Sequence, residues 1–173
     1  MITISKFNFN DLFVLDLANN HQGELNHGIK IINSLGKIVN EKGVRAALKF
    51  QFRDLDTLIH PSFNELGKDQ QIDRFISTKL SETDFNKLFE TVRSNKMITM
   101  CTPFDERSVD KIIEMEFDYI KVASCSAKDW PLLEKVAKSG LPIVASTGGL
   151  ILSDIDALVS FLSHKGCEFS LMH

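Results

Sequence analysis

The feature that most constrains the fold is a repeated alternation between short apolar runs and longer stretches whose apolar residues recur at helical spacing. The runs that predict strands are 12–18, 46–52, 97–104, 119–124, 142–147 and 169–173. Most of them are apolar throughout, which is typical of parallel strands covered on both faces. The alternation therefore predicts an α/β fold built from successive βα units.

Five helices are expected between these strands. The first carries apolar residues from Ile31 to Val39 and ends at Gly43, and the second begins at Ser81. The other three are predicted at 105–116, at 130–139, and from a cap at Ser153 to Gly166. No glycine-rich dinucleotide motif precedes any of them, which favours a (β/α)8 barrel of the TIM type over a doubly wound sheet.

A complete barrel of this type has eight strands and about 250 residues. Residues 1–173 are therefore predicted to form one domain that is an incomplete TIM barrel of six strands and five helices. Strands one and six would each leave an unpaired edge, which a homo-oligomer or a second chain that completes the barrel would cover. A polar segment at 53–80, with Pro61 and Gly67, interrupts the alternation. It is expected to be either a lid or a plain surface excursion.

Composition narrows the choice of partners and compartment. Twenty Lys and Arg residues against 23 Asp and Glu residues give a net charge of −3, which argues against binding to nucleic acid. No signal peptide is recognisable, and the longest uncharged run, the fifteen residues 139–153, is too short to span a bilayer. The three cysteines form no Cys-x-x-Cys pair. A protein of the reducing cytoplasm is expected.

Polar residues at the carboxyl ends of the strands are the candidates for chemistry, because ligands of such barrels bind there. Lys49 and Gln51 are two residues apart and share one face of their strand, and Lys121 lies within an apolar strand. A buried ammonium group is costly without an anion or a hydrogen-bond acceptor. Two such lysines predict an anionic ligand, with hydroxyl donors from Thr102, Ser124, Ser146 and Thr147 at the same rim.

Other interpretations of these residues stay open. Lys49 or Lys121 can pair with Asp16 inside the barrel, and residues 146–149 can form a plain turn between strand and helix.

His21 is expected either to face a ligand or to stabilise its loop through a hydrogen bond. Cys125 is interpreted as a buried, inert thiol.

No two histidines have the spacing of metal ligands. His173 can be one ligand of a site whose other ligands lie beyond it.

Six motifs in order resemble the sialic acid synthase family across nearly the whole chain. They are Val-Leu-Asp-Leu-Ala-Asn-Asn-His-Gln-Gly (14–23), Leu-Lys-Phe-Gln (48–51), Cys-Thr-Pro-Phe-Asp (101–105), Tyr-Ile-Lys-Val-Ala-Ser (119–124), Pro-Leu-Leu-Glu-Lys-Val-Ala-Lys-Ser-Gly (131–140) and Ser-Thr-Gly-Gly (146–149). The resemblance implies a (β/α)8 barrel that condenses phosphoenolpyruvate with an N-acetylated amino sugar such as N-acetylmannosamine. The product would be a nonulosonic acid, with release of phosphate.

The resemblance also implies roles for single residues. Lys49, Thr102, Lys121 and Ser124 would hold phosphoenolpyruvate, whereas Asn20, Gln51 and Ser146 would lie near the sugar. Asp16 would take part in water or proton steps, and Asp16, Lys49 and Lys121 are the catalytic candidates. A divalent metal, Mn²⁺ or Mg²⁺, would polarise the sugar aldehyde. The metal-binding histidines and the antifreeze-like domain of the family would follow position 173.

The sequence departs from the family pattern at two places. Asp16 replaces a glutamate, and Cys125 and Ser126 replace a Gly-Glu pair whose acid lies near the sugar. Two functions therefore remain: a sialic acid synthase, or a synthase-like binding or assembly module that keeps the anion site without turnover. A different phosphoenolpyruvate-using or aldolase-like barrel enzyme is a third.

Overall fold

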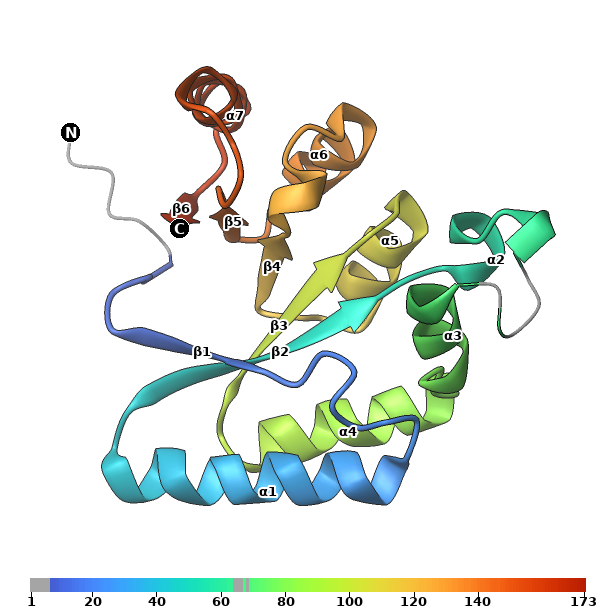
Figure 1. The fold of residues 1–173 in the computed structure, drawn as a ribbon. Helices are drawn as coiled ribbons and strands as arrows, with labels where there is room; N and C mark the ends of the chain where they lie inside the picture. Colours follow the sequence, from blue (N-terminus) through green and yellow to red (C-terminus); the bar gives the residue numbers. More distant parts are fainter. Residues whose placement is uncertain (1–6, 64–66, 68) are drawn as a thin grey trace. The chain divides into compact units, whose positions relative to one another are not determined.

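A computed structural model describes residues 7–63, 67 and 69–173 (Figure 1). The chain divides into two compact units. One is Leu12–Thr99, the 12–99 unit, and the other combines Met1–Asp11 with Met100–His173, the 100–173 unit. The strand β3 (Ile98–Pro103) begins in the first of these and ends in the second.

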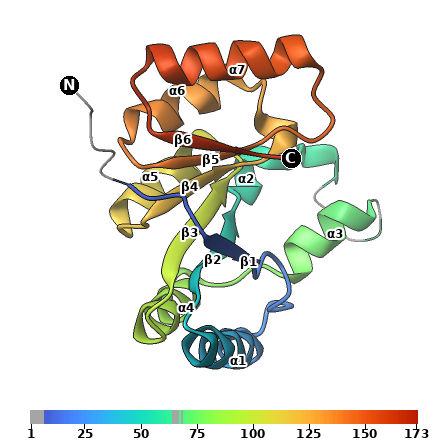
Figure 2. The same ribbon diagram turned by 90° about the vertical axis from the view of Figure 1, so that its left-hand side faces the viewer.

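The 12–99 unit is built on a parallel pair of strands. β1 (Leu12–Asp16) pairs with β2 (Arg45–Phe52), and the register runs from Leu12 opposite Arg45 to Asp16 opposite Lys49. The helix α1 (Leu25–Lys42) connects the two strands, and α4 (Glu82–Ser94) lies beside it (Figures 1 and 2). Leu17, Ile32, Leu48, Phe50 and Leu88 are almost completely buried and form the core of this unit.

Two glycines of α1 allow α4 to approach closely. A Cβ atom at Gly28 would lie 2.8 Å from Leu88 Cδ2, and one at Gly36 would overlap the side chain of Asn95. Asn95 cannot easily move away, because its Nδ2 donates hydrogen bonds to Thr91 O at 2.9 Å and to Asn33 Oδ1 at 2.8 Å. The contact between the helices therefore depends on the absence of a side chain at Gly36.

The substitution Gly36→Leu is expected to destabilise the protein by about 2 kcal/mol, because the overpacking cost exceeds the gain in helix propensity. Urea denaturation would measure the change. Ser34→Leu, at an exposed position of the same helix, is the matched control and should change stability by less than about 0.5 kcal/mol. Equal effects of the two substitutions would show that this helix contact is not tight.

The segment 53–80 contains more regular structure than the sequence indicates. It includes α2 (Leu55–Leu58), a short 3₁₀ helix η1 (Pro61–Phe63) and α3 (Gln70–Ser77). The side chains of Asp54 and Asp69 cap the two α-helices, accepting hydrogen bonds from backbone N–H groups of the first turn. Residues 64–66 and 68 lie outside the described residues. The alternatives of a lid and a surface excursion both stay predictions.

The 100–173 unit continues the βα alternation. Its strands β3, β4 (Tyr119–Val122), β5 (Ile143–Ser146) and β6 (Phe169–Met172) are parallel and follow one another in that order. The intervening elements are α5 (Glu106–Glu114), the 3₁₀ helix η2 (Ser124–Ser126), α6 (Trp130–Lys138) and α7 (Leu152–His164). Figure 2 shows α6 and α7 over one face of β5 and β6. The core contains Met100, Ile112, Ile120, Leu133, Ile143 and Leu158.

All six predicted strands are present, but several element ends differ from the prediction. β1 stops at Asp16, because Ala18 takes a left-handed backbone with φ of 40° that no strand continues. β4 stops at Val122, and Ser124 begins η2 instead of ending the strand. α7 begins at Leu152 after an extended Ile151, which places Ser153 inside the first turn and not at the cap. Within the described residues, no helix combines the length and apolarity that a membrane crossing requires.

Candidate functional site

At the carboxyl end of β1, a carboxylate meets a buried lysine from the middle of β2. Lys49 Nζ lies 3.0 Å from Asp16 Oδ1. Lys49 is only 8% exposed, as the sequence predicts, whereas the side chain of Asp16 is 54% exposed. The ion pair kept open as an alternative for Lys49 is therefore present. Because the carboxylate reaches solvent and an ammonium group has three donor hydrogens, this pair leaves room for a second acceptor on the lysine.

The loop after β1 is held against β2 and carries Asn20. The backbone N–H groups of Leu17 and Ala18 both donate to Lys49 O, at 3.0 and 3.3 Å. Asn20 is exposed, and its Nδ2 donates to Asp16 O at 3.2 Å. The loop therefore brings a predicted sugar ligand, Asn20, next to the predicted acid, Asp16.

His21 stabilises this loop from inside. Its side chain is buried, its Nδ1 accepts a hydrogen bond from Gly23 N at 3.1 Å, and its ring packs edge-on against Phe85 with centroids 6.1 Å apart. The loop-stabilising interpretation is thus what the structure shows. Burial lowers the pKa of His21, and the nearby charge of His27 lowers it further.

Protonation of His21 would place a hydrogen on Nδ1 and remove its bond from Gly23 N. Because the folded-state pKa is lowered, the unfolded chain binds more protons as the pH falls below about 6.5. The stability that neutral His21 contributes is complete above that pH and declines as the pH falls toward the folded pKa. Urea denaturation between pH 8 and pH 5 should show a weaker pH dependence for His21→Asn than for the wild type. An unchanged pH dependence would contradict this role, and the exposed His164→Gln is the control.

Gln51 lies two residues after Lys49, on the same face of β2. The intervening Phe50 and the following Phe52 point the other way and pack against Phe85 of α4, with ring centroids 6.5 and 5.0 Å apart. This confirms the predicted separation of polar and apolar faces. Gln51 Oε1 accepts a hydrogen bond from Arg53 Nη2 at 2.8 Å. Arg53 was not a candidate from the sequence, although its spacing of two from Gln51 is a signal that places both on one face.

A second group of candidates lies in the 100–173 unit, around Lys121. This lysine is 5% exposed, which confirms its predicted burial. Its Nζ donates hydrogen bonds to Val122 O at 3.0 Å and to the hydroxyl of Ser146. Two residues 25 positions apart, one expected at the phosphoenolpyruvate and one at the sugar, are therefore in direct contact.

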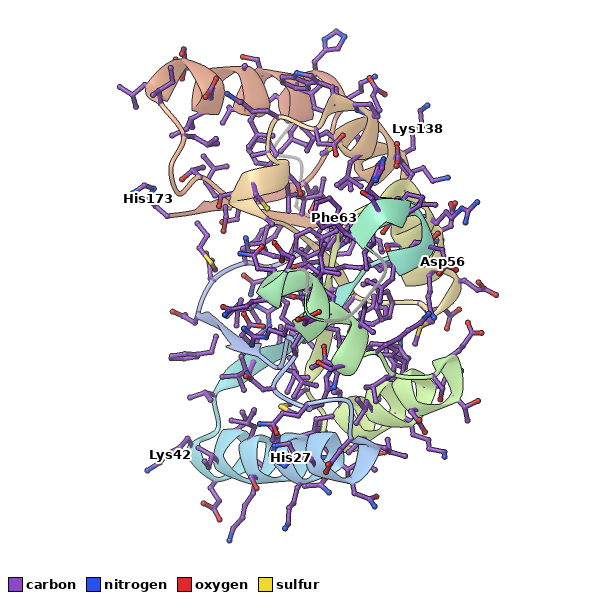
Figure 3. The ribbon with its side chains drawn as sticks, turned by 45° about the vertical axis from the view of Figure 1, so that its right-hand side comes forward. His27, Lys42, Asp56, Phe63, Lys138 and His173 are labelled. Atoms are coloured by element: carbon purple, nitrogen blue, oxygen red, sulfur yellow. The ribbon has the colours of Figure 1, made fainter. Side chains whose placement is uncertain are left out.

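These two buried lysines contrast with the ordinary ones. Lys42, on α1, and Lys138, on α6, are exposed and point away from the ribbon (Figure 3). Lys49 and Lys121 instead lie buried within β2 and β4, where a cation costs free energy unless acceptors meet it. Each is therefore suited to hold an anionic oxygen.

The turn after β5 places the remaining hydroxyl groups. Leu150 N donates to Thr147 O at 3.1 Å and Gly149 has φ of 77°, so residues 146–149 do form a tight strand-to-helix turn. A Cβ atom at Gly148 would lie 3.9 Å from Ser124 Oγ, which puts Ser124 next to this turn. Thr102 is 2% exposed, near the end of β3.

The interpretation of Cys125 as a buried thiol is wrong. The residue is exposed, because it lies in the 3₁₀ turn η2 and not in a covered strand. It occupies the position after Ser124, where the family pattern departs from this sequence.

The described part of the chain contains no group of three or more His, Cys, Asp or Glu side chains that could hold a metal ion. His173 Nδ1 lies 3.1 Å from Thr147 Oγ1 and is a single residue of the ligand type. The residues present thus do not make up a metal site by themselves. Ligands beyond His173 stay a prediction.

Comparison with known proteins identifies the class to which this fold and these residues belong. The chain is similar to a crystal structure of sialic acid synthetase from Leptospira borgpetersenii, with a TM-score of 0.79 and 24% identity over 99% of this chain. This likeness shows the fold. The α/β fold of an incomplete (β/α)8 barrel is confirmed. Residues 38–173 match the NeuB family, and the chain belongs to that family. The resemblance to sialic acid synthases is thereby confirmed.

Two further relatives are more similar in sequence. A crystal structure of a candidate spore coat polysaccharide biosynthesis protein E from Chromobacterium violaceum shares 41% identity at a TM-score of 0.91, over 94% of this chain and 48% of that one. The N,N'-diacetyllegionaminic acid synthase of Legionella pneumophila is 29% identical over 79% of this chain and 39% of its own. The Leptospira protein is covered to 58%. The chain thus spans about half the length of the relatives it matches.

Proposed function

We propose that this chain forms part of a synthase that condenses phosphoenolpyruvate with an N-acetylated amino sugar to give a nonulosonic acid and phosphate. The observation that carries the proposal is the burial of Lys49 within β2 and of Lys121 near the carboxyl end of β4. Membership of the NeuB family supports it, as does the relative named for legionaminic acid synthesis.

In this proposal the two lysines bind the phosphate and carboxylate of one phosphoenolpyruvate. Lys49 belongs to the 12–99 unit and Lys121 to the 100–173 unit. Their action on one ligand is inferred from the family and from the rule that the carboxyl ends of barrel strands hold the ligand. Thr102 and Ser124 would add hydroxyl donors to the same anion. Ammonium and hydroxyl donors to an anionic oxygen form charge-assisted hydrogen bonds, which are the stronger kind.

Asp16 is the proposed acid or base of the proton steps. Its carboxylate is half exposed beside Lys49, so it can exchange protons with water. Asn20, hydrogen-bonded to Asp16 O, and Gln51, on the strand of Lys49, would contact the sugar. Ser146, which accepts from Lys121, would also lie near the sugar. A divalent metal would supply Lewis-acid polarisation of the aldehyde.

A phosphate-release assay tests the proposal on the full-length protein that contains this chain. The assay would supply phosphoenolpyruvate, Mn²⁺ and a panel of N-acetylated hexosamines. Release that requires both the phosphoenolpyruvate and one of the sugars is the expected result. Absence of release with every sugar, although phosphoenolpyruvate binds saturably, would contradict synthesis.

That second result would support the other candidate, a synthase-like binding or assembly module. The observation in favour of the module is the pair Cys125 and Ser126, which stands where the family pattern has Gly-Glu. Ser126, which stands at the position of the acid, is buried in η2 and carries no carboxylate. Completion of the barrel by a homo-oligomer or a second chain stays a prediction.

A further inference from the structure

The side chain of Arg53 joins a candidate sugar ligand to the segment 53–80. Its Nη2 donates to Gln51 Oε1 at 2.8 Å, and its guanidinium carbon lies 4.4 Å from the ring centroid of Phe75 in α3. All three residues are half-buried and belong to the 12–99 unit. The guanidinium group of Arg53 therefore contacts both an amide oxygen and an aromatic face.

This contact fixes which way the amide of Gln51 points. A guanidinium group has five N–H donors and no acceptor, so it can bond only to the oxygen of an amide. With Oε1 turned to Arg53, the NH₂ group of Gln51 must point away from the arginine. Gln51 then offers its NH₂ donors to a molecule that reaches it from the side away from Arg53.

The same helix also supports the loop that carries Asn20. A Cβ atom at Gly23 would lie 2.7 Å from Ser77 O, at the end of α3, so the helix and the loop after β1 are in close contact. Gly23 adopts a φ of 77°, which favours glycine independently. α3 thus rests against the loop of Asn20 at one place and against Arg53 at another.

We propose that Arg53 is a positioning residue, which holds Gln51 so that its NH₂ group donates to an oxygen acceptor of the amino sugar. This inference rests on the proposed function, because that function supplies the sugar. The inference also gives the segment 53–80 a role in sugar binding, because Phe75 of α3 contacts the guanidinium group and holds it in place. The sugar oxygen would be a carbonyl or hydroxyl oxygen, both of which accept hydrogen bonds.

Steady-state kinetics of the full-length protein test the role in sugar binding. Arg53→Met should raise the KM for the sugar about 10-fold, while kcat and the Kd for phosphoenolpyruvate each change by less than about twofold. Arg53→Lys keeps a donor and a cation over Phe75 and should restore part of the loss. The matched control is Arg74→Met, at an exposed arginine of α3, which should have no effect.

A double substitution separates positioning from direct contact. If Arg53 acts through Gln51, then Arg53→Met in a Gln51→Met background should raise the KM no further. Gln51→Glu keeps an oxygen for Arg53 but removes the NH₂ donor, and it should impair sugar binding as strongly as Gln51→Met. Additive effects of the two substitutions, or full activity of Gln51→Glu, would overturn the inference.

Nuclear magnetic resonance of the Gln51 side-chain amide gives a readout that does not need turnover. The two amide protons should resonate away from the random-coil chemical shifts of a glutamine in the wild type, and should move toward those values in Arg53→Met. Identical amide spectra in the two proteins would overturn the positioning role. If the wild type turns over no N-acetylated sugar, the proposed function fails, and these resonances still decide whether Arg53 orients Gln51.

Discussion

Lys121→Met is expected to weaken the binding of phosphoenolpyruvate by about 10- to 100-fold. The substitution keeps the length and apolar stem of the side chain but removes the ammonium group that donates to Val122 O and to Ser146. A hydrogen bond to a charged group contributes about 1.5–3 kcal/mol, which corresponds to this range of affinities. Isothermal titration calorimetry of the full-length protein would measure the change.

The control for this substitution is Lys138→Met, which removes an exposed lysine in the same unit. It should leave the affinity unchanged, because its ammonium group points to solvent (Figure 3). Thermal unfolding of both variants would show that the protein remains folded. A Kd for Lys121→Met within about twofold of the wild type, in a folded protein, would remove Lys121 from the anion site.

Lys49→Met is expected to weaken phosphoenolpyruvate binding by a similar factor of about 10 to 100. Here the structure offers a competing explanation for the burial of Lys49, because this lysine pairs with Asp16 at 3.0 Å. The comparison with Asp16→Asn separates the two. Calorimetry for both variants, together with the phosphate-release assay, gives the necessary measurements.

If Lys49 is an anion ligand, Asp16→Asn should preserve or tighten phosphoenolpyruvate binding, because it removes a negative charge beside the ammonium group. The same variant should lose phosphate release if Asp16 serves the proton steps. If the pair is only structural, both substitutions should lower stability, and neither should change the affinity. That second pattern would contradict the role of Lys49.

The arrangement of strands could be predicted from the sequence because it follows from periodicity. A mostly apolar run such as 46–52 is most stable as a strand that is covered on both faces, and the strand β2 forms there. The ends of the elements depend on single backbone conformations, such as the φ of 40° at Ala18, for which an alanine gives no signal. Helix α3 was missed because the segment 53–80 is polar, although Asp69 is an N-cap residue that could have marked its beginning.

The candidate site was predictable where burial of a single side chain costs an unusual amount of free energy. A lysine inside an apolar strand is such a residue, and both Lys49 and Lys121 are buried as expected. The pairing of Lys49 with Asp16 was among the alternatives, whereas the partner of Lys121 was harder to predict, since its contact with Ser146 joins two different strands. Arg53 could not be found from composition. Its proposed role depends on Phe75, which is 22 positions further along the chain and contacts the guanidinium group only in the folded protein. Cys125 was misjudged because a 3₁₀ turn replaces the end of the predicted strand.

The most direct test of the central claim is a crystal structure of the full-length protein with phosphoenolpyruvate bound. The account predicts that Nζ of Lys49 and Nζ of Lys121 each lie about 2.7–2.9 Å from an oxygen of the same phosphoenolpyruvate molecule. A bound phosphoenolpyruvate that contacts only one of the two lysines, or neither, would contradict it.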